Sequence, residues 1–207
     1  FFLNYFTLGG IDNAGNGNNK IKAGGGVNVI NTGSGNDNIE AYGGANVVIS
    51  GNGNDVVKAG GIANVIYDSG GDTEMYGLAA GNVFVKTGSG TDTMAGVGVA
   101  NVFTKVGSGD TNMYAGGSYY ILTKVSNSYD NDTMIALGKG NFLTKVGHGS
   151  SQMLSMGMFN IQTSWGNSND LMLGIGKINA MIGGVVTISW LLLVREILLS
   201  VTPSELT

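Results

Sequence analysis

The sequence predicts an all-β fold, a parallel β-roll or β-solenoid with coils of about 18–20 residues and a short apolar tail. Three observations predict it. One asparagine returns at a fixed interval, apolar residues return at other fixed positions, and glycine pairs separate the apolar runs. A fixed period of about this length is typical of proteins whose repeats stack as coils, each touching its neighbours.

The asparagine sets the period. It occurs at Asn28, Asn46, Asn64, Asn82, Asn101, Asn141, Asn160 and Asn179, and Tyr120 takes the place of one member. The first steps are 18 residues and later ones 19, with 21 residues between Tyr120 and Asn141. We expect these asparagines to adopt left-handed turn geometry and to hydrogen-bond the coils above and below.

Two sets of apolar residues recur in the same phase. One set is Ile39, Val57, Met75, Met94, Met113, Met134, Met153 and Met172, and the other is Val48, Ile66, Phe84, Phe103, Leu122 and Leu143. Parallel strands about 4.8 Å apart would stack each set into a continuous interior column. Methionine suits such an interior because it adapts to neighbours of different size.

Each period divides into two halves of nearly equal length. Residues 43–49 read GGANVVI and residues 51–57 read GNGNDVV, so Asn46 and Asp55 occupy equivalent positions nine residues apart. Nine residues suit a short strand and a tight glycine turn, and two such halves form one flattened coil. The β-branched and aromatic runs between glycines favour strands over helices.

Composition excludes several classes of protein. Charged residues make up 12% of the 207 residues and the net charge is −4, so no basic surface for nucleic acid is expected. The chain has no cysteine, which excludes disulfide bonds and thiolate metal sites. Lys86, Lys105, Lys124 and Lys145 recur in one phase. We interpret them as a solvated basic stripe on one edge, or as a contact for anionic lipid or cell-surface sugars.

Residues 32–39 (TGSGNDNI) and 50–57 (SGNGNDVV) resemble the glycine-aspartate nonapeptide of repeats-in-toxin (RTX) proteins, except that Thr32 and Ser50 replace the first glycine. The resemblance implies a parallel β-roll with Ca²⁺ in its turns. The implied ligands are the Asp37 and Asp55 side chains and turn carbonyls at Gly33, Gly35, Gly51 and Gly53, with Asn19 as a weaker neighbour. Further along, Asp and hydroxyl residues alternate at this phase, which predicts no continuous row of calcium sites. The residues are Thr73, Asp92, Thr111, Asp130, Ser151 and Asp170.

Residues 100–109 (ANVFTKVGSG) and 141–149 (NFLTKVGHG) resemble the T-x-V-G-x-G repeats of multifunctional-autoprocessing RTX toxins, very large bacterial proteins. The resemblance implies a repeat segment of a secreted toxin, exported by type I secretion. It further implies that the segment adjoins other repeats of a longer chain and helps deliver effectors by engaging the host cell membrane. An adhesive or structural β-solenoid of a bacterial surface protein is the alternative, and lateral self-association fits either function.

Enzyme chemistry is not expected. His148, the one histidine, lies at the variable position of a G-x-G turn, where a solvated side chain is expected. The sequence shows no nucleophile elbow, no catalytic acid pair and no phosphate loop followed by a helix. We therefore expect a non-enzymatic scaffold.

Three regions are expected along the chain. Residues 1–9 form an irregular or capping strand, residues 10–184 form the repeats, and residues 185–207 form an apolar tail. The tail has three interpretations: a helix that caps the stack, a membrane span, or the product of a shifted reading frame. As a span it is short, and Arg195 and Glu196 would lie in the hydrocarbon region. A frameshift is consistent with codon degeneracy, which permits G-x-G-D-T followed by G-A-N in another frame.

Overall fold

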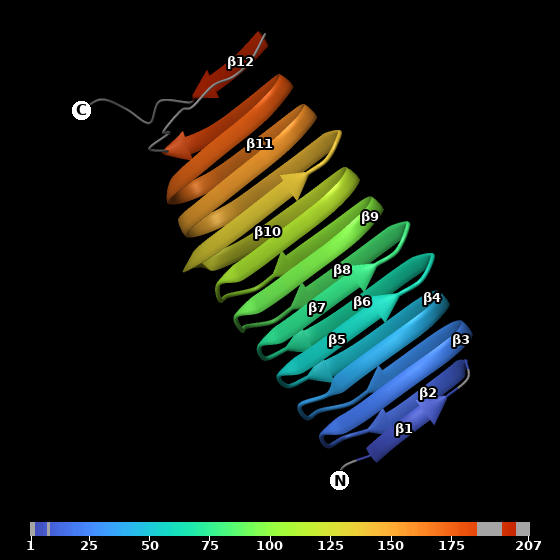
Figure 1. Ribbon diagram of the computed structural model, residues 1–207. Coiled ribbons are helices and arrows are strands. Elements are labelled where there is room, and N and C mark those ends of the chain that lie inside the picture. Colours follow the sequence, from blue (N-terminus) through green and yellow to red (C-terminus); the bar gives the residue numbers. More distant parts are fainter. Residues whose placement is uncertain (1–2, 8, 186–195, 202–207) are drawn as a thin grey trace.

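The computed structural model describes residues 3–7, 9–185 and 196–201. The chain winds into one stack of coils, and its parallel strands follow one another in sequence order from the N-terminus to the C-terminus (Figure 1). No helix occurs in the described residues, so the predicted all-β solenoid is confirmed. The strands are β1 (Leu3–Thr7), β2 (Gly10–Gly15), β3 (Asn19–Thr32), β4 (Asn38–Asn52), β5 (Asp55–Gly60), β6 (Ala63–Gly70), β7 (Thr73–Leu78), β8 (Gly81–Thr87), β9 (Asp92–Val106), β10 (Thr111–Leu137), β11 (Gly140–Val185) and β12 (Glu196–Val201).

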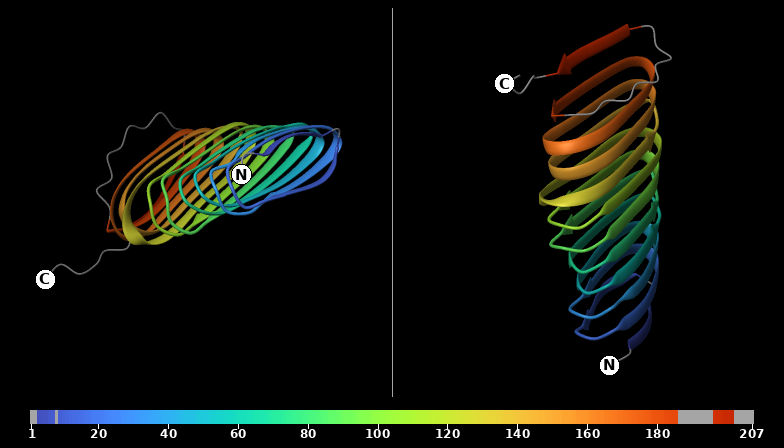
Figure 2. Two further views of the ribbon diagram at one scale, coloured as in Figure 1. Left: turned by 90° about the horizontal axis from the view of Figure 1, so that it is seen from below. Right: turned by 90° about the vertical axis from the view of Figure 1, so that its left-hand side faces the viewer.

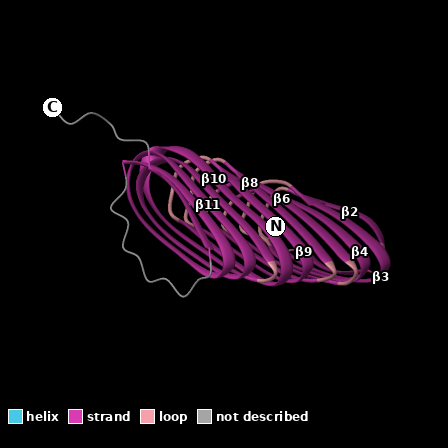
Figure 3. Ribbon diagram, turned by 90° about the horizontal axis from the view of Figure 1, so that it is seen from above, coloured by secondary structure: helices cyan, strands magenta, loops and turns pink. Residues whose placement is uncertain are grey.

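Each coil has two faces. The first half of β4 pairs with β5 and its second half pairs with β6, so one long strand passes around a corner between the faces. Seen end-on, the coils are flattened and enclose a narrow interior (Figure 2). The short loops lie at the edges of the coils (Figure 3). Strands as long as β11, with 46 residues, therefore run through several corners without losing their ladder of hydrogen bonds.

The strand registers confirm both predicted apolar columns. Met75 pairs with Met94 and Met94 with Met113, while Phe84 pairs with Phe103 in the other half of the coil. These side chains are fully buried. The Phe84 and Phe103 rings stack with their centroids 4.6 Å apart. Burial of these columns supplies the main stabilising free energy of the stack, about 1.5–3 kcal/mol for each large side chain.

The asparagines form a buried hydrogen-bonded ladder. The Asn28 amide donates to Asn46 Oδ1 at 2.7 Å, Asn46 to Asn64 at 2.8 Å, and the same bond recurs from Asn141 to Asn160. The predicted contacts between coils are thus confirmed. The predicted left-handed geometry is wrong, because no described non-glycine residue has a positive φ. The asparagines lie within strands, and glycines supply the turns.

Glycine allows successive coils to approach closely at the turns. Gly51 has φ +87° and Gly53 has φ +140°. A Cβ atom on Gly51 would lie 2.0 Å from the Gly33 carbonyl oxygen, and one on Gly53 would lie 2.1 Å from that of Gly35. Both the backbone conformation and the spacing between coils therefore require glycine here.

The two ends of the stack are strands. β1 pairs with the start of β3, and β12 pairs with β11 from Ile178 to Gly183. The expectation of a capping helix is wrong for residues 196–201, while residues 186–195 and 202–207 of the predicted tail lie outside the described residues. No helix in the described part of the chain is long and apolar enough to cross a membrane.

Candidate functional site

Two columns of polar side chains face each other inside one edge of the stack. We name them by their commonest charged residues, and every member is buried. The aspartate column is Asn19, Asp37, Asp55, Thr73, Asp92, Thr111, Asp132, Ser151 and Asp170. The lysine column is Thr32, Ser50, Asp68, Lys86, Lys105, Lys124 and Lys145.

Asp37 and Asp55 lie in adjacent coils of the aspartate column, as the sequence predicted. One oxygen of each carboxylate accepts a backbone N–H from the preceding coil. Asn19 donates to Asp37 Oδ1 at 2.7 Å, and Asp37 donates to Asp55 Oδ1 at 2.7 Å. The second oxygen of each, Oδ2, is buried without a hydrogen-bond partner. Two desolvated carboxylate oxygens therefore lack a donor or a counterion.

Their surroundings disfavour the charged form of both carboxylates. Burial raises the pKa of Asp37, although the Thr32 hydroxyl and Asn19 beside it act in the opposite direction. Burial also raises the pKa of Asp55 to about 8, with a further contribution from the neighbouring Asp68 carboxylate. In the described residues, no ammonium or guanidinium group forms an ion pair with Asp37 or Asp55. Two buried carboxylates without a counterion need a bound proton or a cation to neutralise their charge.

These residues fit Ca²⁺, which prefers carboxylate and carbonyl oxygens. The described part of the chain contains no cluster of three or more acidic, histidine or cysteine side chains suited to a metal. Carbonyl, amide or hydroxyl oxygens would therefore complete the ligand set. The Gly33 carbonyl already accepts a hydrogen bond from Asn52 N at 3.3 Å, while Gly35, Gly51 and Gly53 turn the chain beside the two aspartates.

The lysines lie in the interior, so the expectation of a solvated basic stripe is wrong. The side chains of Lys86, Lys105 and Lys124 have no exposed area and Lys145 has 1%. The same burial removes the expected contact with anionic lipid or sugars. Strand alternation explains the placement, since Asn82, Phe84 and Lys86 follow at every second residue of β8 and share one face.

Each buried ammonium group lies beside interior carboxylates. Lys86 contacts Asp68, and Lys105 contacts Asp92. Lys124 Nζ is 3.4 Å from Asp130 and 3.7 Å from Asp132, and Lys145 Nζ is 3.8 Å from both Asp132 and Asp170. These contacts are ion pairs with both partners at most 5% exposed. Lys124 also donates to the Gly109 carbonyl at 2.6 Å.

Burial opposes charge on both sides of these pairs. It lowers the pKa of Lys105 and raises the pKa of Asp92, although each partner favours the charged form of the other. Burial likewise raises the pKa of Asp132 against the pull of Lys124 and Lys145. Removing one partner would leave an unpaired charge in a dry interior, which costs about 3–5 kcal/mol.

The sequence prediction places the wrong aspartate in the aspartate column at one coil. Asp132, not Asp130, belongs to the aspartate column, because it pairs with Ser151 and accepts a hydrogen bond from Thr111 N. The coil that contains Tyr120 is 21 residues long, and its extra residues lie between Val125 and Tyr129, where the strand register shifts. Residues after this point are therefore displaced by two positions relative to the 19-residue period. Asp130 instead accepts from Gly109 N at 3.0 Å.

His148 is half-buried, in part against expectation. Its ring stacks on Tyr129, with centroids 5.3 Å apart, and its Nδ1 is buried without a partner. Neither contact supplies a nucleophile or an acid partner.

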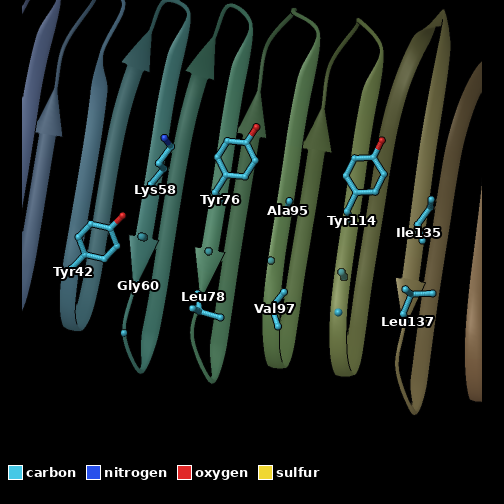
Figure 4. A pocket seen from close by; sticks show the side chains of 16 residues that line it. Tyr42, Lys58, Gly60, Tyr76, Leu78, Ala95, Val97, Tyr114, Ile135 and Leu137 are labelled. Atoms are coloured by element: carbon cyan, nitrogen blue, oxygen red, sulfur yellow. The ribbon is translucent and has the colours of Figure 1, made fainter.

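The outer surface of the stack carries an apolar groove of about 830 Å³. It runs along one face across β4, β5, β7, β9 and β10, and we call it the tyrosine groove (Figure 4). Tyr42, Tyr76 and Tyr114 line it, and Tyr76 and Tyr114 are two coils apart. Leu78 and Val97 are 66% and 54% exposed there. Sequence periodicity did not reveal this groove.

Comparison with known protein families gives two matches. The RTX calcium-binding nonapeptide repeat (4 copies) matches residues 13–39 and 23–57, and the RtxA repeat matches residues 77–93, 96–112 and 136–151. No curated protein and no solved structure matches the chain. The first match covers Asp37 and Asp55, and the second covers Lys86, Lys105 and Lys145.

Proposed function

Because the chain carries a glycine-rich RTX repeat array, we propose that it is a non-enzymatic scaffold segment of a large secreted RTX-type toxin, which engages the target-cell membrane during effector delivery. The observation that carries this proposal is that both kinds of repeat lie in one continuous parallel solenoid. A continuous stack is a stiff spacer, suited to holding neighbouring segments of a long chain apart.

Calcium is the cofactor supported by the nonapeptide match. We assign its binding to Asp37 and Asp55, whose free Oδ2 atoms would be ligands beside the glycine turns. Bound calcium would supply the positive charge that this part of the interior lacks, and it stabilises the folded chain by mass action.

Isothermal titration with calcium tests the ligands. Asp37→Asn and Asp55→Asn should each weaken binding at least tenfold, because each removes one of two charged ligands. Asp72→Asn is the matched control, since Asp72 is exposed and its side chain accepts a hydrogen bond from Thr91 N. Equal binding by all four proteins would refute the assignment.

The tyrosine groove is the surface we assign to the membrane. Tyrosine and exposed aliphatic side chains suit the interface of a bilayer, where an aromatic ring is apolar on one side and its hydroxyl remains hydrated.

Flotation with vesicles tests the membrane assignment. The chain should float with phosphatidylcholine vesicles, and the double variant Leu78→Ser/Val97→Ser should float at least fivefold less. Val65→Ser/Val83→Ser is the control, since these valines are 40% and 37% exposed on the other half of the coil. Absence of flotation, or equal loss in both double variants, would refute a membrane role for the groove and leave the structural or adhesive alternative.

A further inference from the structure

The interior aspartates fall into two groups along the stack. Asp37 and Asp55 have no ammonium partner within the described chain. From Asp68 onward, each inward carboxylate has a lysine Nζ atom within 3.9 Å. The five carboxylates are Asp68, Asp92, Asp130, Asp132 and Asp170. The change from unpaired to lysine-paired aspartates begins in the lysine column, where Lys86 is the register partner of Asp68 in the next coil.

The lysines lie between carboxylates of successive coils. Lys86 contacts Asp68 and is 3.9 Å from Asp92, and Lys145 is 3.8 Å from Asp132 and from Asp170. These two ammonium groups thus bridge acidic groups of different coils, which is also what a calcium ion in a turn would do. A divalent ion placed beside such a group would be repelled at a few ångströms in a dry interior. These coils therefore do not fit Ca²⁺.

The division follows the two repeat matches. The nonapeptide match ends at Val57, before the first lysine of the column, and the three RtxA-repeat matches begin at Gly77. Each RtxA-repeat match contains one lysine of the column, Lys86, Lys105 or Lys145.

We propose that Lys86, Lys105, Lys124 and Lys145 are built-in counterions that replace calcium, so that the metal orders the coils around Asp37 and Asp55 and the coils of residues 81–172 fold without it. This inference rests on the calcium assignment above and is independent of the membrane role. Because repeat proteins are coupled mainly between neighbouring coils, the two parts respond separately to the metal.

Amide hydrogen exchange on the whole chain tests the division. In calcium, compared with chelator, peptides from residues 19–60 should gain at least tenfold protection, and peptides from residues 81–172 should keep theirs within twofold. Protection that changes throughout both regions, or in neither, overturns the proposal. Vesicle flotation is measured separately, so its failure leaves this result intact.

Substitution of one lysine tests the built-in counterion. Lys105→Met should lower the melting temperature by at least 5 °C in calcium and in chelator alike, and should speed exchange in residues 81–106. Lys139→Met is the control, because Lys139 is exposed. Lys105→Met/Asp92→Asn removes both charges of the pair and should recover at least half of the loss, since Lys86 keeps Asp68 as its partner.

The double variant also covers the case in which Lys105→Met does not fold. The proposal is overturned if Lys105→Met has the melting temperature of the wild type, or if the double variant is no more stable than the single one. Recovery of Lys105→Met by calcium to wild-type melting also overturns it, because the metal would then serve the lysine coils as well.

Discussion

Glycine sets the distance between successive turns of this chain. Gly51 combines a positive φ with a carbonyl oxygen where its Cβ would be, whereas a Cβ on Gly26 would meet no atom within 4 Å. Both positions read as glycine in the sequence, and only the backbone distinguishes them.

Gly51→Ala should therefore lower the free energy of unfolding by about 1–3 kcal/mol through backbone strain, with a further loss from the clash. Denaturant unfolding at constant calcium measures it. Gly26→Ala is the control and should change stability by less than about 1 kcal/mol. Equal losses in the two variants would mean that close approach at Gly51 does not limit the turn.

The Asp55 carboxyl makes calcium-free stability depend on pH. Its pKa is about 8 in the folded chain, against 3.8 as the ordinary value. Between these values the folded chain holds a proton that the unfolded chain has lost, so stability falls as pH rises from about 4 to about 8. In chelator, the chain should unfold at lower denaturant at pH 8 than at pH 5.5, and Asp55→Asn should flatten this slope. A slope unchanged in Asp55→Asn, relative to Asp72→Asn, would contradict the assignment.

Within a strand, alternation decides which side chains reach the interior. Met113 is fully buried between Met94 and the following coil, and its neighbour Asn112 lies on the other face. Met113→Asp would bury an unpaired charge and should cost about 3–5 kcal/mol. Circular dichroism and resistance to protease measure the loss. Asn112→Asp, of the same charge, should leave both unchanged, and an unaffected Met113→Asp would refute the interior column.

The same alternation explains what was predicted and what was missed. The period placed Met94, Phe103 and the asparagines in register, because identical side chains mark equivalent positions. It placed Asp37 and Asp55 in adjacent coils for the same reason. The prediction of exposed lysines is wrong because these charged side chains are buried beside carboxylates. Lys105 is two residues from buried Phe103, which already put it on the inner face.

Other features depend on information that no single repeat carries. The inserted residues before Tyr129 hide that Asp132, rather than Asp130, joins the aspartate column. The pairing of Lys86 with Asp68 joins positions 18 residues apart, and the pairing of Lys105 with Asp92 joins the two halves of one coil. The tyrosine groove arises from residues in several coils, and five of these residues are glycines that leave space. The sequence lists these residues but not their separation across the coil.

Across the whole stack, stability has two sources. The apolar core runs from Ile21 to Met181, while the charge balance at one edge changes along the stack, from unpaired aspartates to lysine pairs. The backbone architecture thus stays the same along the stack, while the positive charge that we propose beside the aspartates changes from calcium to lysine. Under our proposal, the first part of its RTX repeat array responds to calcium and the second part carries counterions of its own.

The central claim, a stack of parallel coils in fixed register, is tested most directly by distances between spin labels. The chain has no cysteine, so pairs can be introduced freely. Val47 and Phe142 lie five coils apart through successive register partners, and Val65 and Phe142 lie four apart. At about 4.8 Å per coil, the account predicts narrow distributions near 24 and 19 Å, a difference of about 5 Å. Broad distributions, or separations that do not shorten when the first label moves from Val47 to Val65, would contradict it.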